Sequence, residues 1–327
     1  MIKILIGGSP CTFWSKAKFD GRETEPHGIG WELFKNYRIA KEKFKPDFFL
    51  YENNKSISQE IKQQISNELG VNLMCINSAL VSAQKRERIY AFNWKVEQPE
   101  DRGILLKDIF ESGLPFENVG ECKTIQNAIP KLVKKYGYLP EMFNAYNLAE
   151  ITYKSPTLST GSMVTSSCAT TLFVKTENGA YKVLDGFIEI GGNSYPTKLD
   201  DGEYILRKLT VTECCRLQTI PDDYCRAVSN AQAYKGLGNG WTAEVIIHIL
   251  SGALKDIPKD EEIVVLSMYD GIGTGRYCLD KMGFTNVKYY AYEIDKYAKQ
   301  IAMSNYPDII QMGDAFDLRN PDWTIGY

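Results

Sequence analysis

The residue best suited to chemistry near the start of this sequence is Cys11, which ends the run Gly8-Ser9-Pro10-Cys11. The apolar run at 2–6 predicts a buried strand just before it, and the proline stiffens the loop that carries the thiol. In α/β proteins, loops at the carboxyl ends of strands hold the reacting groups. Cys11 is therefore a candidate nucleophile. The other cysteines of the eight are expected to be reduced thiols that serve mostly as small hydrophobic filler, which is also the plain alternative for Cys11.

An acid and two basic residues follow the thiol along the chain. Glu52 ends the next expected strand, within reach of whatever the thiol attacks. In an extended segment alternate side chains share a face, so Gln84, Arg86 and Arg88 are expected on one face. A solvated, charged edge strand would give the same sequence pattern. Together these segments predict a thiol, an acid and a basic clamp at one edge of a sheet.

A glycine-rich loop near the other end of the chain, from Asp270 to Gly275, follows an apolar strand and opens a helix. Its glycines let the backbone approach a ligand, and free N–H groups at the helix start favour an anionic group. Glu293 closes the next strand, where a carboxylate can accept both ribose hydroxyls, and Asp314 follows a third strand, placed to meet an adenine amino group. The loop alone equally fits a structural turn or a general nucleotide site. With the two acids it indicates an adenosyl cofactor, whose methionine carboxylate would be the anionic group.

The elements that must position these groups alternate between strands and helices, which predicts an α/β fold with a doubly wound, mostly parallel sheet. The expected strands are 2–6, 47–51, 88–94, 263–269, 287–292 and 309–312, and the expected helices are 29–44, 57–69, 274–282 and 295–304. From about residue 95, short β-like runs such as TLFVK and YKVLDGFIEI stand among Gly, Ser, Thr and Asn. The predicted division is a first catalytic part at 1–94, a smaller β-rich domain at 95–231 and a second, cofactor-binding part at 232–327, with a polar linker at 258–262.

The composition limits which class of protein this chain can be. The 327 residues are 44% hydrophobic and 24% charged, as in ordinary soluble proteins. The chain carries no apolar run long enough for a bilayer and no signal-peptide pattern, so a cytoplasmic protein of prokaryotic or phage origin is expected. Neither a C-x-x-C pair nor other zinc-ligand spacing is present, so no metal is expected. The net charge of −3 means that any nucleic acid must be bound by a local basic face.

Several of these segments together resemble the DNA cytosine carbon-5 methyltransferases. Gly8-Ser9-Pro10-Cys11, Tyr51-Glu52-Asn53 and Gln84-x-Arg86-x-Arg88 are similar to three signature motifs. The run from Arg207 to Pro221, RKLTVTECCRLQTIP, is similar to the segment that closes the family's recognition domain. Gly238-Asn239-Gly240-Trp241 resembles its Gly-Asn-Ser cofactor element, with a tryptophan as in the de novo-type animal enzymes, and the acids and glycine loop described above match its adenosylmethionine motifs. The resemblance covers both ends and most of the chain except about 95–150 and 160–205.

The resemblance implies transfer of a methyl group from S-adenosylmethionine to carbon 5 of a cytosine flipped out of double-stranded DNA. Cys11 would attack carbon 6 as a thiolate, with its pKa lowered by nearby positive charge, Glu52 would stabilise charge at ring N3, and Arg88, with Arg86 less directly, would bind O2 or a phosphate. Implied substrate-binding residues are Ser9, Pro10, Asn53 and Gln84. Implied cofactor-binding residues are Tyr269, Asp270, Gly271, Gly273, Gly275, Glu293, Ile294, Asp314, Ala315, Asn239 and Trp241.

The small domain would hold the opened duplex and read neighbouring bases. Lys154-Ser155-Pro156-Thr157-Leu158 is similar to the family's lead-in to that reader, whereas a plain surface loop explains 155–170 equally well.

The order of the motifs is rotated relative to the family, whose members usually begin with the cofactor loop. Joining the C-terminal DLRNPDWTIGY to the N-terminal MIKILIGGSPC would restore the usual order, so a circular permutation is expected. The sequence also departs from the family at Thr12, Asn54 and Gly240, none of which supplies a group that the reaction requires.

Three other interpretations remain open from the sequence: a tRNA cytosine methyltransferase on the same scaffold, a non-catalytic DNA-binding relative, and an enzyme with an unusual S-adenosyl donor.

Overall fold

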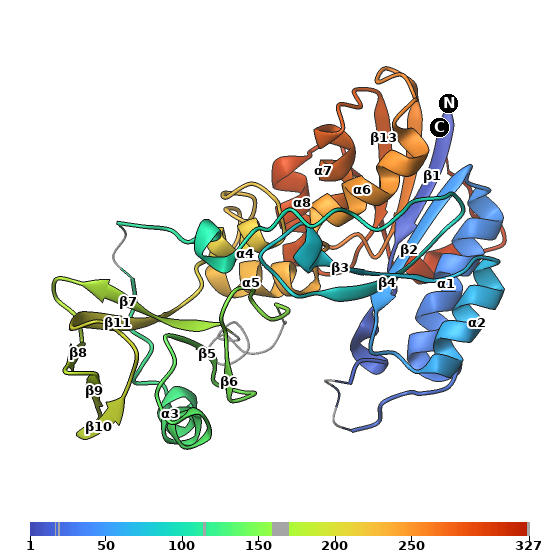
Figure 1. The fold of residues 1–327 in the computed structure, drawn as a ribbon. Helices are drawn as coiled ribbons and strands as arrows, with labels where there is room; N and C mark the ends of the chain where they lie inside the picture. The colour runs from blue at the N-terminus through green and yellow to red at the C-terminus, as the bar shows by residue number, and fades with distance from the viewer. Residues whose placement is uncertain (17, 19, 114–115, 159–169, 326–327) are drawn as a thin grey trace.

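The computed structural model describes residues 1–16, 18, 20–113, 116–158 and 170–325. They form two sheets, each with its own helices, arranged as two lobes (Figure 1). No helix within these ranges is long and apolar enough to span a bilayer.

The first sheet holds all six strands expected for the catalytic part, each within three residues of its predicted ends, and one further strand, β3, which was not predicted. Its order is β14 (Ile310–Gly313), β13 (Val287–Tyr292), β12 (Ile263–Met268), β1 (Ile2–Gly7), β2 (Phe48–Asn54), β4 (Glu87–Phe92) and β3 (Met74–Asn77). The five strands from β14 to β2 run parallel, while β4 is antiparallel to both β2 and β3. The predicted α/β class with a mostly parallel sheet is confirmed.

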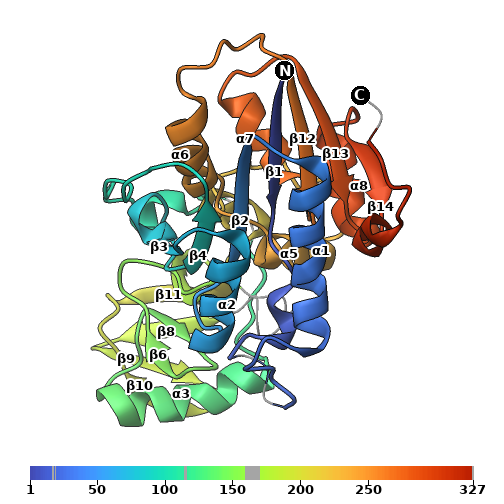
Figure 2. The ribbon, with the colours of Figure 1, turned by 90° about the vertical axis from the view of Figure 1, so that its right-hand side faces the viewer.

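Helices cover both faces of this sheet because its central strands are apolar on both sides. In β1, Leu5 packs toward α1 (Gly28–Phe44), α2 (Gln59–Leu69) and the 3-10 helix η5 (Ala315–Arg319), whereas Ile4 and Ile6 pack into the core on the other face. That second core contains α4 (Val211–Leu217), α5 (Asn230–Asn239), α6 (Ala243–Leu254), α7 (Thr274–Lys281) and α8 (Lys296–Asn305). Figure 2 shows α1 and α2 on the opposite side of the sheet from α6 and α7.

The centre of the sheet joins segments from opposite ends of the chain. β1 pairs with β12 in parallel register from Ile2–Ile263 to Gly7–Met268. The loops that follow these two strands therefore emerge side by side, at one edge of the sheet.

The smaller lobe is built on an antiparallel sheet, in the order β10 (Asn193–Pro196), β9 (Phe187–Ile190), β8 (Tyr181–Leu184), β11 (Gly202–Lys208), β7 (Thr171–Thr176), β5 (Met142–Asn144) and β6 (Ala149–Glu150). The runs TLFVK and YKVLDGFIEI form β7 and the β8–β9 hairpin, as predicted for a β-rich domain. Helix α3 (Lys123–Tyr136), which was not predicted, packs on this sheet through Ile129 and Leu132.

Segments from within 95–231 also pack in the core of the first lobe, and the division at 95 and 231 remains a prediction. Leu106 and Ile109, in the 3-10 helix η3 (Leu106–Ile109), and the apolar residues of 209–225 pack into the core of the first lobe. At the junction, Arg207 of β11 is almost fully buried and forms a two-pronged ion pair with Glu213 of α4, at 2.7 and 2.8 Å. This pair connects the end of the small sheet to the first lobe.

Candidate active site

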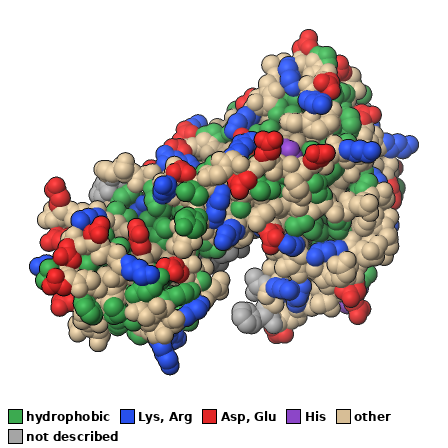
Figure 3. All heavy atoms as spheres, viewed as in Figure 1, with side chains coloured by type: hydrophobic (Ala, Val, Ile, Leu, Met, Phe, Trp, Pro, Cys, Tyr) green, Lys and Arg blue, Asp and Glu red, His purple; other side chains and the backbone are tan. Residues whose placement is uncertain are grey.

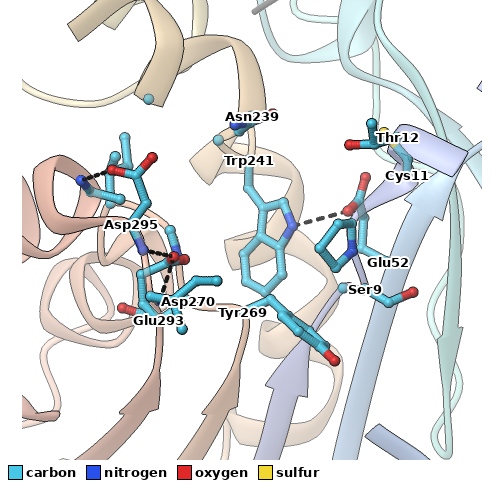
Figure 4. A pocket seen from close by; sticks show the side chains of 18 of the residues that line it. Ser9, Cys11, Thr12, Glu52, Asn239, Trp241, Tyr269, Asp270, Glu293 and Asp295 are labelled. Carbon is cyan, nitrogen blue, oxygen red and sulfur yellow. Dashed lines mark hydrogen bonds between the residues drawn. The ribbon is translucent and has the colours of Figure 1, made fainter. Parts of the chain in front are cut away.

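A cavity of about 440 Å³ lies where β1, β2, β12, β13 and β14 end. Cys11 from the loop after β1 and Gly271 from the loop after β12 line the same cavity. Figure 4 shows Cys11, Thr12 and Glu52 on one side, Asp270, Glu293 and Asp295 on the other, and Trp241 between them. The two ends of the sequence thus build one pocket, whose volume suits a small organic ligand.

Most of the residues proposed from the sequence line this cavity. On the thiol side they are Ser9, Pro10, Cys11, Glu52, Asn53, Arg86 and Arg88. On the glycine-loop side they are Asn239, Trp241, Tyr269, Asp270, Gly271, Glu293, Ile294, Asp314 and Ala315. Gln84, Gly273 and Gly275 do not line it.

A buried polar network behind the Pro-Cys loop holds the thiol in place. Ser9 Oγ and the Tyr51 hydroxyl share a hydrogen bond of 2.8 Å, and Asn53 Nδ2 donates to the Ser9 carbonyl at 3.0 Å and to the Tyr51 hydroxyl at 2.9 Å. Ser9 and Asn53 are almost fully buried. They therefore shape the loop from behind.

The segment after Cys11 is anchored to the start of α1. Cys11 begins the short 3-10 helix η1 (Cys11–Phe13), and the Trp14 and Ser15 N–H groups donate to its carbonyl. The Trp14 side chain is fully buried, and its indole N–H donates to Glu23 at 3.1 Å. Glu23 also accepts the backbone N–H groups of Ile29 and Gly30, which satisfies donors at the helix N-terminus.

The expectation that nearby positive charge lowers the pKa of Cys11 is wrong for the protein without ligands. Burial is the largest influence and raises the pKa of this thiol, and the negative charge of Glu52 adds to the increase. Arg88 and Arg86 act in the lowering direction but do not outweigh burial. The thiol is mainly protonated in this state.

Glu52 has a donor on each carboxylate oxygen. Arg88 Nε lies 3.0 Å from Oε1, and the Trp241 indole N–H donates to Oε2 at 3.2 Å (Figure 4). The carboxylate also sits against the backbone of Gly8, where an added Cβ would lie 2.9 Å from Oε2. A side chain at position 8 would therefore displace Glu52.

Arg86 belongs to the wall of the site, whereas Gln84 does not line it. The Arg86 guanidinium is buried and donates to the carbonyls of Leu158, Gly238 and Gly240, at 3.3, 3.1 and 2.8 Å. Burial lowers the pKa of Arg86 to about 9. Gln84 donates to the Leu217 carbonyl and to Gln218, outside the pocket. Of the three residues expected on a common face, Arg86 and Arg88 line the cavity and Gln84 does not.

Asp270 is a buried acid with one unused oxygen. Oδ1 accepts hydrogen bonds from Ser267 Oγ at 2.7 Å and from the Tyr289 hydroxyl at 2.6 Å. Oδ2 is buried and has no hydrogen-bond partner among the described residues. Burial raises the pKa of this carboxyl to about 6. A buried acceptor beside a cavity is suited to a donor carried by a ligand.

Glu293 organises the glycine loop. Its Oε2 accepts the Gly271 N–H at 2.9 Å, and its Oε1 accepts the N–H groups of Ile294 and Asp295 at 2.8 and 2.7 Å. Gly271 has a φ of 64°, a left-handed conformation that favours glycine. Burial raises the pKa of Glu293.

Gly273 and Gly275, proposed as cofactor contacts, do not line the cavity and lie at close packing contacts of α7. A Cβ on Gly275 would overlap Ile6 and the Tyr289 hydroxyl, and one on Gly273 would lie 3.0 Å from Ala302 Cβ. Both glycines let the helix approach its neighbours closely. A glycine pattern in the sequence does not separate this role from ligand contact.

Asp314 and Tyr269 also line the glycine-loop side of the cavity. Asp314 caps η5 by accepting the Phe316 N–H at 3.0 Å, and the Tyr269 hydroxyl donates to the Leu33 carbonyl.

Sequence reasoning missed several lining residues: Leu33, Lys235, Tyr292, Asp295, Tyr297 and Phe316. Only Asp295 carried a signal, since an Asp directly before a helix is a common N-cap, and it caps α8 here.

We expect Asp270→Asn to remove a pH dependence of stability in the ligand-free protein. Because the folded-state pKa is raised, the free energy of unfolding of the wild type should fall by up to about 3 kcal/mol as pH rises from 4 to 7. Asparagine keeps an oxygen for Ser267 and Tyr289 but has no charge to bury. Urea unfolding at pH 4 and pH 7 measures the difference between the two proteins, and equal pH dependence in both would contradict the assignment.

Comparisons with known proteins place the chain in a family. The family model of the C-5 cytosine-specific DNA methylase matches residues 1–255. The chain is 24% identical over 291 residues to the type II methyltransferase M.FnuDI of Fusobacterium nucleatum, with 79% of this chain and 78% of that protein covered. It is 27% identical to M1.ScrFI of Lactococcus lactis subsp. cremoris (79% and 64% covered) and 26% identical to M.SsoII of Shigella sonnei (75% and 62% covered), so it spans less than two thirds of these two relatives. With more than half of its length matched, the chain belongs to the C-5 cytosine-specific DNA methylase family.

Proposed function

We propose that this protein transfers a methyl group from S-adenosylmethionine to carbon 5 of a cytosine in double-stranded DNA, through a covalent bond to Cys11. The observation that carries the proposal is the single cavity with a thiol, an acid and an arginine on one side and three strand-end acids on the other. The names of the relatives, all type II methyltransferases, also favour a role in modifying DNA within a restriction-modification system.

The acid-lined side fits an adenosyl cofactor. The unpartnered Oδ2 of Asp270 offers an acceptor to a cationic or N–H group, and Glu293 Oε2, which accepts the Gly271 N–H, has one further lone pair for a ribose hydroxyl. Ile294 and Phe316 are exposed apolar side chains at the cavity, suited to the faces of an adenine ring. S-adenosylmethionine, when bound, supplies an activated methyl group.

The thiol side fits a cytosine ring. Cys11, as the thiolate, adds to carbon 6, and this makes carbon 5 nucleophilic. Glu52 holds a proton at ring N3 and offsets the charge that develops there, while Arg88 binds O2 or the adjacent phosphate. Once carbon 5 carries the transferred methyl group, loss of the carbon 5 proton releases Cys11 by elimination.

Burial raises the pKa of Cys11, so the attack requires the thiol to lose its proton. That proton reaches ring N3 through the Glu52 carboxylate, which gives a thiolate and a positively charged pyrimidine that together form a neutral adduct. The positive charge on the pyrimidine opposes the effect of burial on the Cys11 pKa.

Binding of DNA is proposed in the hollow between the two lobes. Figure 3 shows this hollow with Lys and Arg side chains at its rim. A cytosine inside a stacked duplex is out of reach of Cys11, so it must be extruded, at a cost of a few kcal/mol that phosphate and pocket contacts offset. Lys154 to Leu158 immediately precede 159–169, which lie outside the described residues.

We also propose that the chain is a circularly permuted member of the family. The match to the family ends at residue 255, and the glycine loop with its acids follows at 263–314. The parallel pairing of β1 with β12 supports the proposal, because it joins the two halves as neighbours within one sheet.

Transfer of tritium from methyl-labelled S-adenosylmethionine tests the function. Duplex DNA, single-stranded DNA and tRNA are offered separately, and label in duplex DNA that is recovered as 5-methylcytosine is the expected result. Label in tRNA alone, or in none of the three, would overturn the proposal. Bisulfite sequencing of DNA from cells that express the protein then identifies the target site.

A further inference from the structure

The indole of Trp241 forms a link between the two halves of the cavity. Its ring stands between the acids of the glycine-loop side and the Cys11 loop (Figure 4). Its N–H donates to Glu52 Oε2 at 3.2 Å, while Arg88 Nε takes the other oxygen at 3.0 Å. The orientation of the Glu52 carboxylate therefore depends on two donors, one of which is part of the wall between the compartments.

The loop that carries Trp241 is held firmly. The Gly240 carbonyl accepts from Arg86 Nη2 at 2.8 Å and from Gln218 Nε2 at 3.1 Å, and Thr242 Oγ1 donates to Gln218 Oε1 at 2.9 Å. Gln218 and Thr242 are buried. Hydrogen bonds on both sides of position 241 thus fix the direction of the indole N–H.

We propose that Trp241 is a positioning residue for Glu52, in addition to being a wall of the cofactor compartment. The assignment rests on the proposed function. A donor fixed before the reaction keeps the carboxyl group aimed at the base without reorganisation in the transition state. Because the ring also faces the cofactor side, a bound cofactor packs against the group that orients Glu52, and the two compartments are coupled.

The test distinguishes the effect of the Trp241 ring from the effect of its N–H group. Trp241→Phe keeps an aromatic wall but removes the donor, so kcat should fall about 10- to 100-fold while the dissociation constant for the cofactor stays within about 3-fold. Benzothienylalanine at position 241 replaces the N–H with sulfur at almost unchanged shape, and it should give the same loss of kcat. Trp94→Phe is the matched control, since Trp94 donates its indole N–H to the Ile249 carbonyl outside the pocket, and kcat should remain at the wild-type value.

The outcomes are distinct. Loss of kcat in both Trp241 variants, with wild-type thermal stability and cofactor affinity, supports the proposal. Unchanged kcat in the benzothienylalanine protein, or weaker cofactor binding as the only effect, would overturn it. Absence of methyl transfer by the wild type in the same assay would instead refute the proposed function.

Discussion

Cys11→Ser is expected to reduce methyl transfer to duplex DNA by at least about 10³-fold while cofactor binding remains. A serine hydroxyl is a far weaker nucleophile than a thiolate, and no other cysteine lines the cavity among the described residues. Cys11 stands on the far side of Trp241 from Glu293 and Asp270, so the change should leave the proposed cofactor contacts in place. Tritium transfer and calorimetric titration with S-adenosylmethionine measure the two properties on the same preparation.

Cys75→Ser provides the matched control for this variant. Cys75 lies on β3, is also a partly exposed free thiol, and does not line the cavity. The control should transfer methyl groups at the wild-type rate. Transfer that persists in Cys11→Ser would remove Cys11 from the nucleophile role.

Glu293→Ala is expected to weaken binding of S-adenosylmethionine by about 100-fold or more, since hydrogen bonds to a charged group contribute about 1.5–3 kcal/mol each. The change removes the acceptor proposed for the ribose. It also leaves the N–H groups of Gly271, Ile294 and Asp295 without the carboxylate that organises the loop. Calorimetric titration measures the affinity, and a thermal melt verifies folding.

Glu262→Gln is the control for the Glu293 variant. Glu262 pairs with Lys288 at the opposite end of β13, far from the pocket, and its replacement should leave cofactor affinity unchanged. If Glu293→Ala binds the cofactor as tightly as the wild type, the acid-lined side of the cavity is not the adenosyl site.

Much of the fold and the pocket could be predicted from the sequence because both depend on local patterns. Apolar strands followed by Cys11, Glu52 and Glu293 predicted which groups stand at the carboxyl edge of a parallel sheet, and the structure brings these three side chains to one cavity. The class of fold follows from the same alternation of strands and helices. The chemical roles of the residues remain predictions.

The rest depends on contacts that a linear pattern does not encode. Arg86 has the residue type of a phosphate contact, yet its guanidinium is occupied by three backbone carbonyls from distant segments. Gly275 fits a cofactor motif, but its closest neighbours are Ile6 and Tyr289. The direction of the Cys11 pKa depends on how far burial outweighs two arginines, which only the three-dimensional arrangement determines.

The pairing of β1 with β12 has a consequence for biosynthesis. About 260 residues separate the two strands, so at about 5–20 residues per second the ribosome needs roughly 13–50 s to deliver the second after the first. During that interval the nascent chain carries an apolar strand with one unprotected edge, the kind of surface that chaperones shield and that promotes aggregation. Translation that stops at the 258–262 linker would leave a polypeptide that contains Cys11 but lacks Asp270, Glu293 and Asp314 on the other side of the cavity.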